Sequence, residues 1–110
     1  MDYRLKKEKD FDFVFKKGKR LFAFGLTMLY CPSNELKVGF AVGKKYGGSV
    51  KRNRIKRILR ESFRSFLPEL RQNFFFVFMP KVQEEYNLEK VKKDMYYLFN
   101  KGNFFKEKQC

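Results

Sequence analysis

The sequence contains no histidine and no tryptophan, and only two of its 110 residues are cysteines. Histidine is the most common general base near neutral pH and the most common metal ligand. Its absence excludes a two-histidine ribonuclease, a Ser-His-Asp hydrolase and a nuclease with a histidine-bound metal. Cys31 and Cys110 are too few for a disulfide framework or a four-cysteine zinc site, so we expect both to be inert free thiols.

Long apolar runs are also absent. The longest nearly uncharged stretch is residues 21–34, whereas a membrane-spanning helix needs about 20 apolar residues. The opening residues Met-Asp-Tyr-Arg-Leu-Lys-Lys are not followed by the apolar segment of a secretory signal. We therefore expect a cytoplasmic protein. The three prolines stand where elements should end, and no repeat or linker is visible, which predicts a single domain over residues 1–110.

Acidic residues are scarce, because 12 Asp and Glu stand against 26 Lys and Arg, a formal net charge of +14. A surface this basic repels itself, and a bound polyanion relieves that repulsion. Hydrophobic residues make up 44% of the chain, enough to bury a core, which excludes a disordered tail. Some of the 15 Phe and 6 Tyr residues could stack on unpaired bases. Nucleic acid is thus the leading candidate partner, and an anionic membrane surface is the second.

Hydrophobic periodicity predicts an α+β fold of order αββαβα. We expect residues 19–31 and 36–42 to form a hairpin, and residues 73–79 to be a central strand buried on both faces. Ser49 is the expected N-cap of the second helix. The segments with helical spacing are 10–17, 49–66 and 87–101.

Residues 51–64 form the most informative segment, with seven basic residues and one acid. As a helix, it places Ile55, Ile58 and Leu59 on one side. A solvated opposite face normally pairs its cations with acids at i,i+4, and here Glu61 is the only acid. We therefore expect nucleic-acid phosphates along this face, for which arginine is well suited. The polar face is formed by Asn53, Arg57, Arg60 and Arg64, flanked by Lys56, with Lys44 and Lys45 near the helix N-terminus.

The same segment and its surroundings carry a family resemblance. Residues 38–57 read Val-Gly-Phe-Ala-Val-Gly-Lys-Lys-Tyr-Gly-Gly-Ser-Val-Lys-Arg-Asn-Arg-Ile-Lys-Arg, and residues 5–18 contain Leu-Lys-x-x-x-Asp-Phe-x-x-Val-Phe-x-x-Gly. Both resemble the protein subunit of bacterial ribonuclease P, and Arg-Asn-Arg-x-Lys-Arg at 52–57 is the most specific part of the match. Ser49 is a mild departure, because a small apolar residue is more usual there.

The resemblance implies a single α+β domain of order αβββαβα, a sandwich of helices and one mixed sheet with a left-handed crossover to the basic helix. The segment 19–31 would then contain two strands. The family's catalyst is an RNA that removes the 5′ leader of precursor tRNA with Mg²⁺, which we expect to be held mainly by RNA. The chain would be an accessory subunit without catalytic or metal-binding residues. Its partners would be the catalytic RNA and precursor tRNA, with no membrane and no protein partner.

The resemblance also implies RNA-binding positions. Phe11, Phe15 and Tyr30 match residues that line a cleft for the single-stranded leader between the first helix and the sheet. Aromatic residues at helical spacing are nevertheless more often core residues. The helix bordering the cleft would contribute Asn53, Lys56 and Arg60. The other basic positions, which would contact the leader or the catalytic RNA, are Lys44, Lys45, Arg52, Arg54, Arg57 and Arg64.

Several alternatives stay open at this point. Asp10 and Asp12 could bind a metal, but their spacing does not place both on one helix face, and Asp10 is better explained by the helix dipole. Gly39 and Ala41 would leave a shallow floor for an extended chain. A generic or ribosome-associated RNA-binding protein would share the charge and the aromatics. A protein-only nuclease would need clustered carboxylates, and a membrane-surface protein would need the apolar helix face that the core uses.

Overall fold

The computed structural model describes residues 3–106. Its elements follow the order αβββαβα that the resemblance implies, and the α+β class predicted from periodicity is confirmed. Two short 3₁₀ turns, η1 (Lys44–Tyr46) and η2 (Leu67–Glu69), flank the second helix. The helices are α1 (Glu8–Lys17), α2 (Ser49–Phe66) and α3 (Leu88–Lys101), and the strands are β1 (Lys19–Phe22), β2 (Leu26–Pro32), β3 (Lys37–Phe40) and β4 (Phe74–Pro80).

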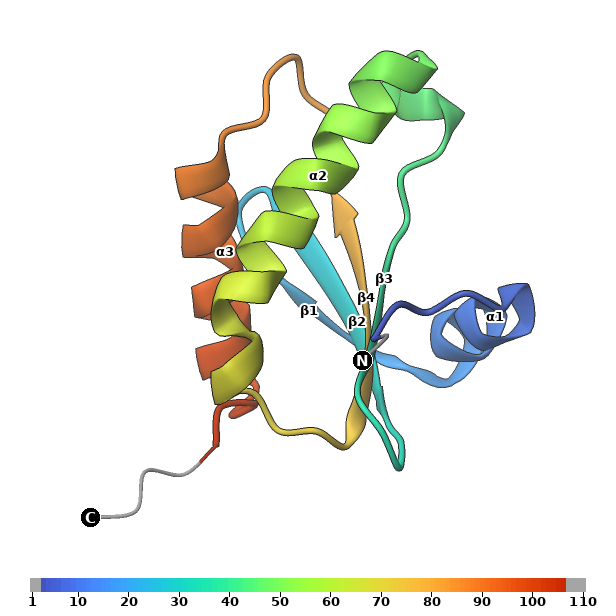
Figure 1. Ribbon diagram of the computed structural model, residues 1–110, viewed down its shortest axis with the longest axis vertical. Helices are drawn as coiled ribbons and strands as arrows, with labels where there is room; N and C mark the ends of the chain where they lie inside the picture. The colour runs from blue at the N-terminus through green and yellow to red at the C-terminus, as the bar shows by residue number, and fades with distance from the viewer. Residues whose placement is uncertain (1–2, 107–110) are drawn as a thin grey trace.

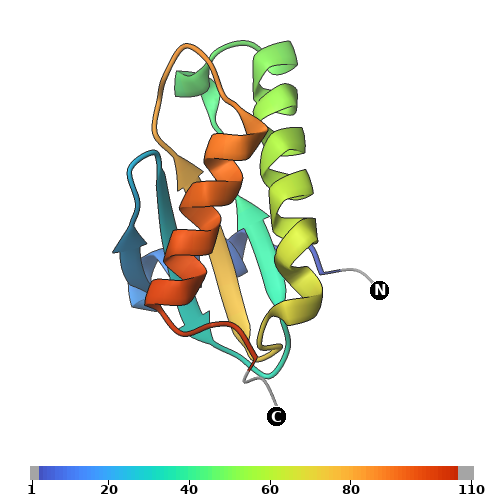
Figure 2. The ribbon, with the colours of Figure 1, turned by 90° about the vertical axis from the view of Figure 1, so that its left-hand side faces the viewer.

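The four strands form one mixed sheet in the order β1-β2-β4-β3. β2 pairs antiparallel with both β1 and β4, whereas β3 pairs parallel with β4. In Figure 2, α2 and α3 lie in front of the sheet, β4 lies to the left of β3, and both strands point upward. The connection from β3 through α2 to β4 is therefore left-handed, although connections between parallel strands are right-handed in almost all proteins.

Two expectations about the strands are wrong. The predicted single strand at 19–31 is interrupted at residues 23–25, so β1 and β2 form the hairpin. The predicted hairpin between 19–31 and 36–42 does not form, because β4 lies between β2 and β3. The apolar run of β4 allows burial on both faces at the centre of the sheet. Ser49 is the first residue of α2 rather than its N-cap, which is Gly48.

The sheet separates two helical layers, with α2 and α3 on one side and α1 on the other (Figure 1). We call these sides of the sheet the two-helix face and the α1 face. The core on the two-helix face includes the fully buried rings of Phe63, Phe76 and Phe99. A smaller core on the α1 face includes Val14 and Leu29. On β2 and β4, the side chains that point to the α1 face are Thr27, Leu29, Cys31, Phe75, Val77 and Met79.

The position of α2 follows from its apolar side and from the turn before it. Ile55 and Leu59 are buried, as predicted from the sequence, and Ile58 packs at the margin of the same core. Gly47 has φ of +124°, a conformation that glycine adopts without strain. The Tyr46 hydroxyl donates to the Pro80 carbonyl oxygen at 2.6 Å. This bond ties η1, and with it the start of α2, to the end of β4.

Candidate nucleic-acid interface

The cations of α2 divide into two groups according to the side of the helix. Arg52, Lys56 and Arg60 are spaced by four residues and are all half-buried, so they lie along one side. We call these three residues the basic flank. Among the described residues, the Nε atoms of Arg52 and Arg60 are buried without a hydrogen-bond partner. The stems of both side chains therefore lie against the protein, which limits the conformations of their guanidinium groups.

The basic flank is on the side of α2 that faces the β3 edge of the sheet. Leu5 N donates to Val38 O, and Val38 N donates to Tyr3 O, each at 2.8 Å, so the N-terminal segment extends this edge. The Tyr3 side chain hydrogen-bonds the Arg64 guanidinium, which raises the pKa of Arg64. Arg60 precedes Arg64 by about one helical turn, so it is directed toward the same edge.

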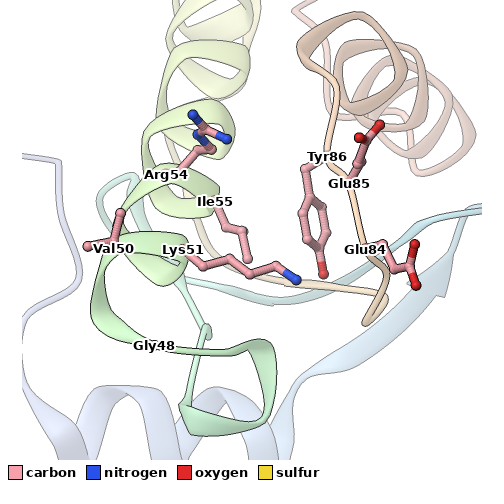
Figure 3. Close-up of a pocket in the computed structure, with 8 residues that line it drawn as sticks. All are labelled: Gly48, Val50, Lys51, Arg54, Ile55, Glu84, Glu85 and Tyr86. Atoms are coloured by element: carbon pink, nitrogen blue, oxygen red, sulfur yellow. The ribbon is translucent and has the colours of Figure 1, made fainter.

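The opposite side of α2 faces carboxylates. A cavity of about 630 Å³ has Lys51 and Arg54 on one wall and Glu84 and Glu85 on the other (Figure 3). A neighbouring cavity is lined by Arg54, Arg57 and Glu61. Nearby carboxylates weaken the attraction of these cations for phosphate. The sequence pattern did not separate Arg54 and Arg57 from the other cations, because it does not place the 81–87 loop beside α2.

Phe11 and Phe15 project from α1 onto the α1 face, and both rings are half-exposed. The Phe11 ring covers Gly39 so closely that a Cβ at this position would overlap the distal ring atoms. Gly39 therefore does not leave an open surface for an extended chain, contrary to the expectation from the sequence. Ala41 and Met79 pack against the same core and are half-exposed. Partly exposed rings beside small and flexible apolar side chains form a surface on which unpaired bases can stack.

Tyr30 is not part of this surface. Side chains alternate along β2, so Tyr30 points to the two-helix face and Leu29 to the α1 face. The Tyr30 ring packs edge-on against Phe104, with 4.7 Å between ring centroids. The expectation that Tyr30 joins Phe11 and Phe15 between the first helix and the sheet is wrong, because alternation alone does not reveal which face a helix covers. Leu29 occupies the corresponding position toward α1 and is fully buried.

The N-terminal end of α2 adds further positive charge. Lys44 and Lys45 are exposed in η1, and the Lys45 Nζ lies 5.4 Å from the centre of the Tyr46 ring. No side chain of residues 3–106 caps the N-terminus of α2, so its first N–H groups and the helix dipole add partial positive charge. Asn53 is exposed in the first turns of the helix, next to Arg52 in sequence.

The described residues offer little that could perform catalysis. Within residues 3–106, no group of three or more His, Cys, Asp or Glu side chains is placed to hold a metal ion. Cys31 is buried and unpaired, and burial raises the pKa of its thiol, which disfavours the reactive thiolate. Cys110 lies outside the described residues. In the same part of the chain, no helix is both long enough and apolar enough to cross a membrane.

Comparison with known proteins agrees with these observations. The family model described as Ribonuclease P matches residues 1–103. The chain belongs to the ribonuclease P protein family. It is 36% identical to the ribonuclease P protein component of Bacillus velezensis, over 94% of this chain and 92% of that protein. It is 37% identical to that of Caldanaerobacter subterraneus subsp. tengcongensis, over 96% of this chain and 94% of that protein.

Solved structures of ribonuclease P proteins share the fold. The protein from Staphylococcus aureus superposes with a TM-score of 0.83 at 23% identity, covering 96% of this chain and 100% of that one. The protein from Thermotoga maritima superposes with a TM-score of 0.79 at 27% identity, covering 89% and 96%. A ribonuclease P protein is a subunit of an endoribonuclease whose catalytic RNA is the other subunit. This role agrees with a basic chain that lacks histidine, and it favours ribonuclease P over a generic RNA-binding protein.

Proposed function

We propose that the chain binds the catalytic RNA of ribonuclease P and the single-stranded 5′ leader of precursor tRNA, and so aids removal of the leader. The observation that carries the proposal is the pair of half-exposed rings, Phe11 and Phe15, on the α1 face. A duplex hides the faces of its bases, whereas an unpaired leader exposes them for stacking. The Mg²⁺ of the reaction would be held mainly by RNA phosphates.

The charges around α2 support a division of its cations into residues that would bind RNA strongly and residues that would bind it less. The basic flank lies at the β3 edge, which borders the α1 face, and a strand that crosses this edge could place phosphates beside Lys56 and Arg60. Arg54 and Arg57 have carboxylates in their cavities and would contribute less to RNA binding. Lys44, Lys45 and Arg64 are exposed cations that could contact the leader or the catalytic RNA, and Asn53 would add a hydrogen bond to either RNA.

Phe15→Leu tests the proposal, because it removes the ring and keeps an apolar side chain against the α1-face core. In a holoenzyme reconstituted with a bacterial ribonuclease P RNA, the variant should bind precursor tRNA about five-fold or more weakly, the lower end of the range for base–aromatic stacking. Its affinity for mature tRNA should not change, because the mature product lacks the leader.

Phe13→Leu is the matched control. Phe13 is on the same helix and is 51% exposed, but it does not pack against the α1-face core. The Phe13→Leu variant should bind precursor and mature tRNA with the affinities of the parent. If Phe15→Leu remained folded and lost the same affinity for precursor and mature tRNA, the leader would not lie on the α1 face.

A further inference from the structure

The tip of the β1–β2 hairpin presents an exposed aromatic ring beside a cation. Phe24 is 94% exposed, more than any other large apolar side chain among the described residues. The Lys81 Nζ lies 5.9 Å from the centre of its ring, within the range of a cation–π contact. The ring contributes nothing to either core. An exposed ring next to a cation suits an unpaired nucleotide where an RNA strand reaches it, since the base can stack and the phosphate is attracted.

This hairpin tip is held in place on two sides. Gly25 N donates to Asp94 Oδ2 of α3 at 3.1 Å. Lys81 N donates to Gly25 O at 3.0 Å, which fixes the tip to the chain after β4. These bonds hold the backbone next to Phe24 before any ligand binds, and a preorganised site loses less conformational entropy on binding.

One cavity is lined by residues of both the hairpin tip and the α1 face. Its volume is about 340 Å³, and its lining includes Phe24, Lys45 and Lys81 together with Thr27 and Met79. Thr27 and Met79 are paired across β2 and β4, and both side chains point to the α1 face. A strand lying over the uncovered part of that face can therefore continue directly to the Phe24 ring.

We propose that Phe24 stacks on one further unpaired nucleotide of the precursor tRNA leader, distinct from those over Phe11 and Phe15. Lys45 and Lys81 attract the phosphates beside that nucleotide. The absence of any carboxylate from the described lining of the cavity favours an RNA strand over a basic partner protein. The inference rests on the proposed function, because the leader reaches Phe24 only if it crosses the α1 face.

The test uses holoenzyme reconstituted with a bacterial ribonuclease P RNA and precursor tRNAs that carry one abasic nucleotide at successive leader positions. Phe24→Ala should weaken binding of intact precursor tRNA by about five-fold or more, leave mature tRNA unaffected, and leave the fold intact because the ring is exposed. At one leader position, the abasic substitution should weaken binding by the parent and have no effect on Phe24→Ala. Phe24→Tyr, which keeps a ring, should behave like the parent.

Tyr97→Ala provides a matched control. Tyr97 is 51% exposed on α3, and the Lys101 Nζ lies 5.6 Å from its ring centre, so it has the same chemistry at a different place. This variant should bind every RNA like the parent.

The outcomes separate this inference from the proposed function. If each abasic substitution weakened binding by Phe24→Ala as much as binding by the parent, the Phe24 site would be refuted. A leader position at which the abasic substitution no longer affected Phe15→Leu would still support a leader on the α1 face. If an abasic substitution weakened binding by the parent at no leader position, both the Phe24 site and the leader on the α1 face would be refuted. An equal loss of affinity for mature tRNA in Phe24→Ala would overturn the inference, because the ring would then contact another RNA.

Discussion

The contact between Gly39 and Phe11 provides a quantitative test of how α1 packs on the sheet. A Cβ at Gly39 would overlap the distal ring atoms of Phe11 and would lie 3.4 Å from the Leu5 Cβ. Gly39→Ala must therefore displace the ring or shift α1. Overpacking a core costs about 1–3 kcal/mol, whereas replacing glycine by alanine within a regular element gains about 0.5–1 kcal/mol. We expect a net loss of about 1–2 kcal/mol in the free energy of unfolding.

A double-mutant cycle with Phe11→Ala isolates this contact. Once the ring is removed, Gly39→Ala should be neutral or stabilising by up to about 1 kcal/mol. The coupling energy between the two positions should then be about 2 kcal/mol, within the range for residues in contact. Urea unfolding of the parent, the two single variants and the double variant measures all four free energies, and an unchanged m-value would show that the denatured state is comparable.

Gly43→Ala is the matched control, because, apart from Gly43 and its two chain neighbours, no atom of the described residues lies within 4 Å of a Cβ placed there. It should have little effect in either background. If Gly39→Ala destabilised the parent and the Phe11→Ala variant equally, the Phe11 ring would not lie over Gly39, and the described packing of α1 would be refuted.

Two further predictions concern charge. Neutralising the basic flank (Arg52→Gln, Lys56→Gln, Arg60→Gln) should flatten the salt dependence of precursor tRNA binding by the reconstituted holoenzyme. The expected change is about 0.7–0.9 in log–log slope for each phosphate that the protein no longer neutralises. Lys51→Gln with Arg54→Gln and Arg57→Gln, an equal charge change beside the carboxylates, should alter the slope less, and equal slopes would contradict the division of α2. Burial raises the pKa of Asp94, so the carboxylate form destabilises the fold as pH rises through that pKa. Asp94→Asn, whose amide oxygen can still accept from Gly25, should be more stable than the parent near neutral pH and equal to it in acid, and urea unfolding showing the reverse trend would refute this.

The elements were largely predictable because their signals are local. α2 spans Ser49–Phe66 and differs from the prediction only in that Ser49, the expected N-cap, is its first residue, since an apolar stripe, a preceding glycine pair and a following proline all mark this helix. Val91, Met95, Leu98 and Phe99 are the buried side of α3, as their spacing indicates. The order of strands in the sheet was not predictable in this way, because periodicity indicates which residues share a face but not which strands pair. The family resemblance implied a mixed sheet with a left-handed crossover, and the parallel pairing of β3 with β4 is known only from the structure.

The candidate site was predictable only in part, for the same reason. Both faces of the sheet are apolar, so the alternation of β2 gave no sign that Tyr30 and α1 lie on opposite sides. The position of Phe11 and Phe15 beside the sheet was predictable because both are on α1 itself, and their contact with RNA stays a prediction. The carboxylates of Glu84 and Glu85 come near Arg54 only through tertiary structure. Phe24 was grouped with a regular strand, and its exposure follows from the break between β1 and β2.

The order of the strands also constrains how the chain can fold during synthesis. β4 pairs with both β2 and β3, yet it is made after both strands and after the whole of α2. Until residues 74–80 have left the ribosome, β1 and β2 can pair only with each other, and β3 has no strand partner other than the N-terminal segment. Pairings between segments far apart in sequence form slowly. The apolar side of the basic helix therefore has no complete sheet to pack on until β4 emerges, and the surfaces that we propose for RNA binding form together at that point.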